Sequence, residues 1–151
     1  MSELLPPDVR PKAFAAVELL LDLTYIGQTI VRADLESMLI FMCVAEATMR
    51  PLVLGKDVPP ETLLLAEPPD ELRGSISRLT IADRTGLARE TVRRKTNALI
   101  RMGLLSEAGD SRVRTVRIMR DAAVQAAARE GFAAVQRYII RMRQFGIDSP
   151  A

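Results

Sequence analysis

The sequence predicts a mainly α-helical chain that carries one small, basic β-hairpin in its C-terminal half. Apolar residues recur at helical spacing in two segments near the N-terminus and in one near the C-terminus. Between them, two shorter helical segments are separated by a glycine, and two short extended segments flank Gly109-Asp110. The 151 residues, 48% of them hydrophobic and 26% charged, suffice for one globular domain with an added arm.

The first two expected elements are helices. The first covers residues 11–32, with Pro11 at a favourable first position and an apolar face at Phe14, Val17, Leu21 and Thr24. Asp34 is expected to cap the second, over residues 35–49, whose nearly continuous apolar character indicates burial. Its Cys43 is expected to be a small buried hydrophobe. Met38, Met42 and Met49 are expected to lie in the core. The alternative is that they line a pocket for a lipophilic effector.

Proline and glycine interrupt residues 50–74. Pro51, Gly55, Pro59-Pro60 and Pro68-Pro69 bracket a loop-rich stretch with at most one short helix near residues 61–66. So long a connection is unusual in a compact domain, and the sequence assigns it no role.

A regular pattern begins at Ser77, which is expected to cap a short helix over residues 78–85. Gly86 closes that helix, and a longer one spans residues 89–102 and ends before Gly103. Gly86 can adopt the positive φ of a tight turn, and Ala82 is small where the two helices would cross. The residues expected to pack between these helices are Leu79, Ile81, Leu87, Val92 and Leu99.

Residues 104–108, 109–111 and 112–118 are expected to form a strand, a tight turn and a strand. Helix, turn, helix and basic hairpin, in this order, are the elements of a winged helix-turn-helix. We therefore divide the chain into a helical N-terminal arm and linker (1–70), a winged helix-turn-helix DNA-binding region (71–119) and a C-terminal dimerisation helix (120–147), capped by Asp121.

The C-terminal helix has apolar and small residues at alternating spacings of four and three. They are Val124, Ala128, Gly131, Val135, Tyr138, Met142 and Phe145. This period favours a partner helix along a narrow seam, as in a homodimer. Packing on the N-terminal helices of the same chain is the alternative, and a dimer made by both termini would satisfy both.

The two halves of the chain carry opposite charge. Residues 1–70 hold five basic and eleven acidic residues, a net charge of −6, whereas residues 71–151 hold sixteen and eight, a net charge of +8. Such asymmetry indicates a polyanionic partner for the basic half.

The helix 89–102 offers groups that can read base edges. With Val92 at the centre of its buried face, Glu90, Arg94, Asn97 and Arg101 lie on the opposite face. The expected base-reading residues are Arg89, Glu90, Arg93, Arg94 and Asn97. The expected DNA-backbone contacts are Ser77, Arg78, Thr80, Arg101, Arg112 and Arg114. A merely solvated, charged helix is the alternative.

Residues 78–94, and above all Arg89-Glu90-Thr91-Val92-Arg93-Arg94, resemble the helix-turn-helix of the Crp/Fnr regulators. The resemblance implies that Arg89, Glu90 and Arg94 contact bases. The continuation to Leu105 resembles MarR- and GntR-type winged helices, and the layout with terminal helices is similar to that of MarR regulators. Three positions depart from the pattern: Ala88 replaces a capping serine, and Lys95 and Thr96 replace apolar residues.

Several function classes lose support. The chain has no histidine and a single cysteine, which removes Ser–His and Cys–His nucleophile pairs, internal disulfides and imidazole metal sites. We expect no enzyme activity, no metal and no cofactor. Because charge-free stretches reach only nine residues and no signal peptide is evident, we expect a cytoplasmic protein without a membrane partner.

The expected function is sequence-specific binding of duplex DNA by a homodimeric transcriptional regulator. The alternative is a winged-helix protein–protein interaction module without sequence-specific DNA binding. A small-molecule effector has no support in the sequence.

Overall fold

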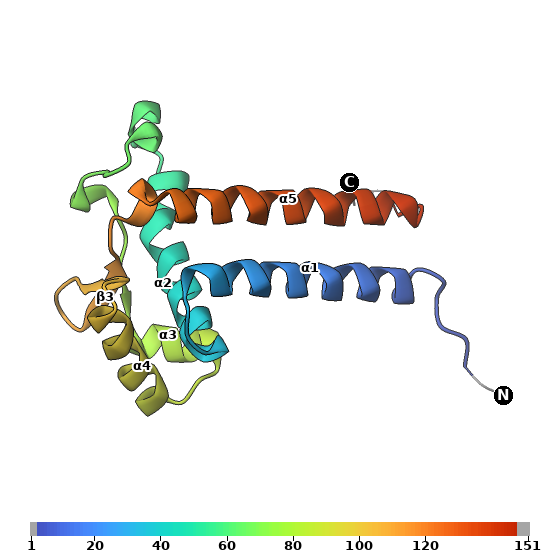
Figure 1. Cartoon of the computed structure of the whole chain (residues 1–151), viewed down its shortest axis with the longest axis horizontal. Helices are drawn as coiled ribbons and strands as arrows, with labels where there is room; N and C mark the ends of the chain where they lie inside the picture. Colours follow the sequence, from blue (N-terminus) through green and yellow to red (C-terminus); the bar gives the residue numbers. More distant parts are fainter. Residues whose placement is uncertain (1–2, 148–151) are drawn as a thin grey trace.

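The computed structural model describes residues 3–147 and is mainly helical, with a small three-stranded antiparallel sheet (Figure 1). Helices α1 and α5 lie side by side and extend from the rest of the molecule like an arm. The elements are α1 (Val9–Ile30), α2 (Leu35–Leu54), the 3₁₀ helices η1 (Pro60–Leu64) and η2 (Asp70–Leu72), β1 (Ile76–Ser77), α3 (Arg78–Thr85), α4 (Arg89–Arg101), β2 (Leu105–Glu107), β3 (Arg112–Thr115), η3 (Ile118–Arg120) and α5 (Ala122–Gln144).

Helix α2 ends at Leu54, five residues beyond its expected end at residue 49, and Pro51 lies inside it instead of ending it. Proline has no N–H to donate, so it weakens the backbone ladder at this turn. The backbone of the following loop comes up to the same turn, where Gly74 N–H donates to the Thr48 carbonyl at 2.9 Å. Position 74 must be glycine because a Cβ there would lie 2.1 Å from the Ala47 carbonyl oxygen. The proline-rich connection is thereby fastened to the end of α2.

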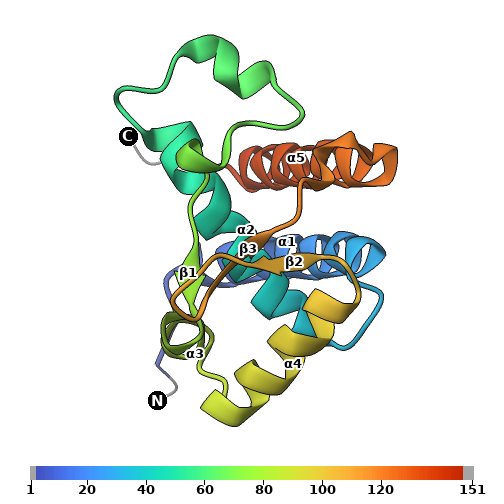
Figure 2. The same ribbon diagram turned by 90° about the vertical axis from the view of Figure 1, so that its left-hand side faces the viewer.

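The main core lies around α2, which packs against α3, α4 and β3 (Figure 2). Its buried members are Val31, Ile40, Phe41, Val44, Ile76, Ile81, Ala82, Val92, Leu99, Leu105 and Val113. The core therefore joins residues from both sides of position 70, and α2 is part of the unit that carries α3 and α4.

The sheet has the order β1-β3-β2, with Ile76 opposite Val113 and Leu105 opposite Thr115. Strand β1 is not among the predicted elements, because two residues are too few to show alternation. The second strand of the hairpin ends at Thr115 rather than 118, and η3 follows it. The turn lies where expected, with positive φ at Gly109, Asp110 and Ser111.

Helices α1 and α5 pack antiparallel along most of their length. The Phe14 and Phe145 rings meet edge to face at 6.3 Å, and Glu18 pairs with Arg141. Small residues, Ala15 on α1 and Ala127 and Ala134 on α5, are buried between the helices.

This packing changes two expectations. Gly131 and Phe145 of the predicted seam face α1 of the same chain, which is the alternative to a partner helix, whereas Ala128 and Val135 remain exposed. On α1, Val17 and Leu21 of the expected apolar face are exposed because α5 and α2 cover other sides of the helix. Phe14 is half-exposed although its ring contacts Phe145.

Three further core predictions are corrected. Leu79 is 49% exposed because it lies on the outer side of α3, while Ile81 and Ala82 point inward. Met49 is exposed, unlike Met38 and Met42, which are half-buried near Gly27. Cys43 is half-buried rather than fully buried, and burial raises the pKa of its thiol. A raised pKa leaves less of the reactive thiolate.

Among the described residues, α1 and α2 are each long and apolar enough to cross a membrane, judged by length and composition. Their charge-free stretches are short, but the few charged residues in each helix leave its mean hydropathy high. Core helices pass the same test, and α2 supplies Ile40, Phe41 and Val44 to the core.

Candidate nucleic-acid interface

Local interactions fix both ends of α3, and the second of these ends leads into the turn to α4. The Ser77 hydroxyl caps α3 by accepting from Thr80 N–H at 3.1 Å. Gly86 ends α3 in the left-handed region at φ +75°, which a residue with a Cβ adopts only with strain. Helix α4 begins after Ala88 without a side-chain cap, as the sequence predicts. Three residues thus separate the two helices.

The buried side of α4 fixes which residues face outward. Val92, Thr96 and Leu99 are fully buried. Arg89, Arg94 and Arg101 are exposed. Within residues 3–147, these three arginines form no ion pair and no side-chain hydrogen bond.

Two of the expected base-reading residues are paired with each other. Arg93 Nε donates to Glu90 Oε2 at 2.9 Å, and Arg93 Nη2 donates to Oε1 at 2.5 Å. This contact holds the pKa of Glu90 below its ordinary value. Both side chains are exposed, so the pair lies on the surface and each group can exchange its partner for another.

Arg78, an expected contact to the DNA backbone, is engaged by other groups of the chain. Its guanidinium donates to Glu107 Oε1 at 2.8 Å, to Asn97 Oδ1 at 3.2 Å and to the Ser111 carbonyl at 3.2 Å. Its side chain is only 19% exposed. Arg78 therefore joins α3 to α4 and to the hairpin, and it occupies the oxygen that Asn97 would offer to adenine. Glu107, which completes this network, has no sequence motif that would have identified it.

The hairpin arginines are anchored to the segment that precedes β1. Arg112 is exposed and donates to Ser75 Oγ at 2.9 Å and to the Ser75 carbonyl at 2.7 Å. Arg114 lies beside Asp70, with its Nη1 3.6 Å from Oδ1, and its side chain is 18% exposed. Val113 between them is fully buried, as expected. Arg114 is therefore less available to a DNA backbone than the sequence predicts.

Lys95 ties α4 to the start of α2. Its Nζ lies 2.9 Å from Asp34 Oδ2 and 3.5 Å from Glu36 Oε2. The aliphatic stem covers apolar surface while the ammonium reaches the carboxylates, which explains why a charged residue is tolerated at this position. Asp34 also caps α2, because its Oδ1 accepts from Ser37 N–H at 2.8 Å.

Asp34 gives a pH-dependent prediction. Its hydrogen bonds, first from Lys95 and then from Ser37 N–H, hold its pKa below the ordinary 3.8. Because the folded-state pKa is the lower one, the contribution of the carboxylate to stability is complete above about pH 4 and is lost as the pH falls through the folded-state pKa. Asp34→Ala should cost about 1 kcal/mol at pH 7 in urea unfolding. Asp34→Asn keeps a capping oxygen, so it should cost less, and its deficit should shrink in acid. A deficit of Asp34→Asn that is constant from pH 7 to pH 2 would contradict this assignment.

Thr96 is a buried threonine whose Oγ1 has no hydrogen-bond partner among the described residues. An unsatisfied buried hydroxyl is destabilising. Thr96→Val should therefore raise the free energy of unfolding by about 1 kcal/mol, measured as a higher urea midpoint at unchanged slope. Thr48→Val is the matched control. The Thr48 hydroxyl donates to the Val44 carbonyl and accepts from Thr115 N–H, so its removal should destabilise the chain.

No protein-family model, curated protein or solved structure matches the chain. Its own residues therefore carry the functional argument. The described surface of α4 presents three unpaired guanidiniums. The N-terminus of α3 presents the hydroxyls of Ser77 and Thr80, which hydrogen-bond each other at 2.9 Å. Guanidinium and hydroxyl groups donate hydrogen bonds to phosphate oxygens and to base-edge acceptors.

Proposed function

We propose that residues 76–115 are a winged helix-turn-helix and that the protein binds duplex DNA in a sequence-specific manner as a homodimeric transcriptional regulator in the cytoplasm. The observation that carries the proposal is the outward face of α4. Arg94 and Arg101 are exposed there, and Arg89 is exposed at the first residue of the helix. These three have no acidic partner among the described residues, whereas Arg78, Arg93 and Lys95 are paired. Unpaired cations along one helix face favour a polyanion.

In this proposal α4 enters the major groove. Arg89 and Arg94 read bases, as the resemblance to Crp/Fnr regulators implies, and Glu90 and Arg93 can join them when their surface pair opens. Ser77, Thr80 and Arg101 contact the DNA backbone and position the helix without reading sequence. The network of Arg78, Asn97 and Glu107 has a supporting role, because it holds the hairpin against the two helices.

The homodimer is supported by the arm. Helices α1 and α5 each keep large apolar side chains exposed although they pack on each other. These side chains are Val9, Phe14, Val17, Leu20, Leu21, Leu23 and Tyr25 on α1, Phe132, Val135, Ile139 and Ile140 on α5, and Phe145 directly after α5. A second copy of the same arm is the partner that covers both apolar helices at once. A two-fold dimer of this kind would place its two α4 helices on half-sites about 10 bp apart, or a multiple of that.

The first experiment is selection from a random duplex library, followed by fluorescence anisotropy on the enriched sequence across a salt series. We expect a palindromic site bound roughly 10³-fold more tightly than random DNA. Binding without enrichment would contradict sequence specificity. No binding at low salt would contradict DNA binding altogether and would support a protein-interaction module.

Arg94 should determine specificity at a single base position. Arg94→Ala is expected to lose about 1–3 kcal/mol of binding to the selected site and to relax its preference at that position. Arg101→Ala should weaken all sequences alike and lower the salt slope by about one. Lys56→Ala, an equal change of charge on the exposed loop after α2, should leave anisotropy titrations unchanged. Identical behaviour of the Arg94 and Arg101 variants would refute the separate roles.

A further inference from the structure

The outer face of the small sheet carries a cavity of about 400 Å³ that the DNA-binding proposal does not use. Alternation along β3 turns Val113 and Thr115 into the core and Arg114 to the opposite face. The loop that contains η2 runs beside this face. The lining residues are Asp70, Arg73, Ser106, Glu107, Ala108, Arg114, Val116 and Arg117.

Three guanidiniums in this cavity converge on one carboxylate oxygen. Asp70 Oδ1 lies 2.8 Å from Arg117 Nη2, 3.1 Å from Arg73 Nη1 and 3.6 Å from Arg114 Nη1. The side chains of Arg73 and Arg114 are only 8% and 18% exposed. Hydrogen bonds, first from Arg117 and then from Arg73, hold the pKa of Asp70 below its ordinary value, so the carboxylate is charged at neutral pH.

The acidic groups around the cavity do not balance these arginines. Glu107 also lines it, but both of its oxygens face Arg78, at 2.8 and 3.5 Å. Among the described residues that line the cavity, Asp70 is then the one carboxylate left for three cations, two of them largely buried. Arg73 also donates to the Thr115 carbonyl, an acceptor without a full charge. Partly buried cations with too little countercharge are costly, because desolvation is not offset by attraction.

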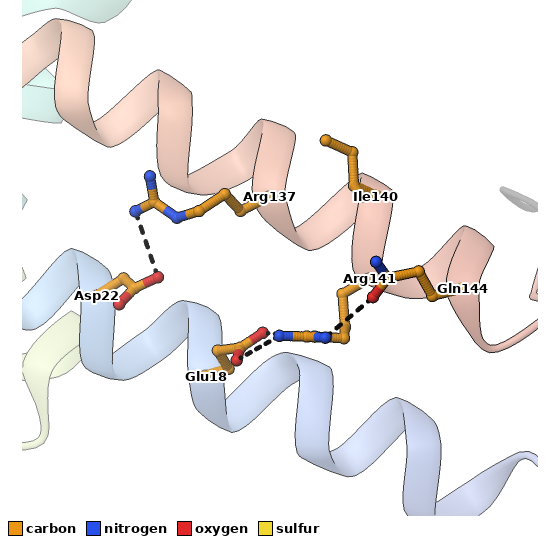
Figure 3. Close-up of a pocket in the computed structure, with 6 residues that line it drawn as sticks. All are labelled: Glu18, Asp22, Arg137, Ile140, Arg141 and Gln144. Atoms are coloured by element: carbon orange, nitrogen blue, oxygen red, sulfur yellow. Dashed lines mark hydrogen bonds and ion pairs between the residues drawn. The ribbon is translucent and has the colours of Figure 1, made fainter.

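A second cavity, of about 360 Å³ between α1 and α5, provides the contrast (Figure 3). There Arg141 faces Glu18 at 3.0 and 3.1 Å, and Arg137 faces Asp22 at 3.4 Å. Each guanidinium has a carboxylate of its own, so no further anion is needed. Of these two cavities, the one on the sheet therefore has more guanidiniums than carboxylates to pair with them, and the one between α1 and α5 does not.

Arg114 has an additional unused donor. Its Nε is buried and forms no hydrogen bond within the described residues, while its Nη1 is 3.4 Å from the Asp70 carbonyl. Buried guanidinium nitrogens are normally paired with acceptors. The unpaired Nε thus belongs to one of the three arginines whose guanidiniums contact Asp70.

We propose that Arg73, Arg114 and Arg117 bind a phosphate group on the outer face of the sheet. A phosphate dianion offers several acceptor oxygens and two charges, which match the excess positive charge left by Asp70. The cavity volume is within the range of small-molecule sites. The site goes beyond the proposed DNA binding, because a free phosphate monoester supplies both charges. A DNA-backbone phosphate offers the same kind of acceptor oxygen but carries only one charge.

Calorimetric titration of inorganic phosphate into the full chain tests the site, with sodium chloride added to hold the ionic strength constant. We expect saturable binding of one phosphate per chain and at least tenfold weaker binding by Arg114→Gln. Arg50→Gln, which breaks a surface pair with Glu46, should bind phosphate like the unmodified chain. Circular dichroism melts check that each variant is folded.

Asp70→Asn separates a binding site from a purely structural ion cluster. Removal of the competing carboxylate should tighten phosphate binding several-fold, whereas a structural cluster would gain no affinity. No saturable binding by either the unmodified chain or Asp70→Asn would overturn the proposal.

Addition of phosphate to the complex with the selected duplex distinguishes the two sources. Displacement of DNA with the calorimetric affinity identifies a backbone phosphate as the occupant, and a ternary complex identifies a free phosphate ester. If the chain binds no DNA, the calorimetric result stands alone, so the two proposals fail independently.

Discussion

Leu21→Glu combined with Phe132→Glu is expected to convert a homodimer into single chains and to lower affinity for a two-half-site duplex by about 10²-fold or more. Leu21 on α1 and Phe132 on α5 are both exposed, so a charged side chain at either position should change the stability of the single chain little. In a dimer that buries both helices, two unpaired carboxylates per chain would enter an apolar interface. Size-exclusion chromatography with light scattering gives the mass, and anisotropy gives the affinity.

Leu64→Glu is the control for the arm. Leu64 is also exposed and apolar, but it lies on η1, away from the arm. This variant should keep the mass and the affinity of the unmodified chain. If Leu64→Glu dissociates the protein while the arm variant does not, the dimer is formed by the connection after α2, and our assignment of the arm is wrong.

Leu99→Ala is expected to lower the free energy of unfolding by about 2–5 kcal/mol. Leu99 lies in the core with no exposed surface, between α4 and the elements that pack on it. Truncation removes buried methyl groups and leaves a cavity that close-packed neighbours fill only in part. Urea unfolding followed by circular dichroism measures the loss, and it is large against the total stability of a small domain.

Leu79→Ala provides the comparison within the same pair of helices. Leu79 is 49% exposed on α3, so its truncation should change stability by less than about 1 kcal/mol. The two leucines were equivalent core candidates in the sequence. Equal losses for both variants would mean that α3 packs with its other face inward, and the orientation described for α3 would be wrong.

The orientation of α4 could be predicted from its sequence because one period controls it. With Val92 inward, the spacing of 3.6 residues per turn places Leu99 inward and Arg94 and Arg101 outward, as the structure confirms. The ends of α3 could also be predicted, because the residues that set them act locally. Ser77 caps the start of the helix and Gly86 ends it, each through contacts within a few residues of its own position.

The partners of the charged side chains could not be predicted in the same way. Arg78 contacts Glu107, 29 residues away, and Asp70 contacts Arg117, 47 residues away. Such contacts depend on how the hairpin and the proline-rich connection fold back onto the helices. Sequence alone therefore assigned Arg78 and Arg114 to a DNA backbone, whereas the structure places them in contact with acidic residues of the chain.

The sequence by itself determined the order of the helices, the turn at Gly86, the hairpin at Gly109-Asp110 and the outward face of α4, because caps, glycine turns and periodicity are local properties of the chain. Tertiary structure decided which side of α1 is covered, that α2 belongs to the main core, and which arginines remain unpaired. Burial and ion pairing depend on distances between segments that are remote in sequence, and those distances are set only when the elements pack together.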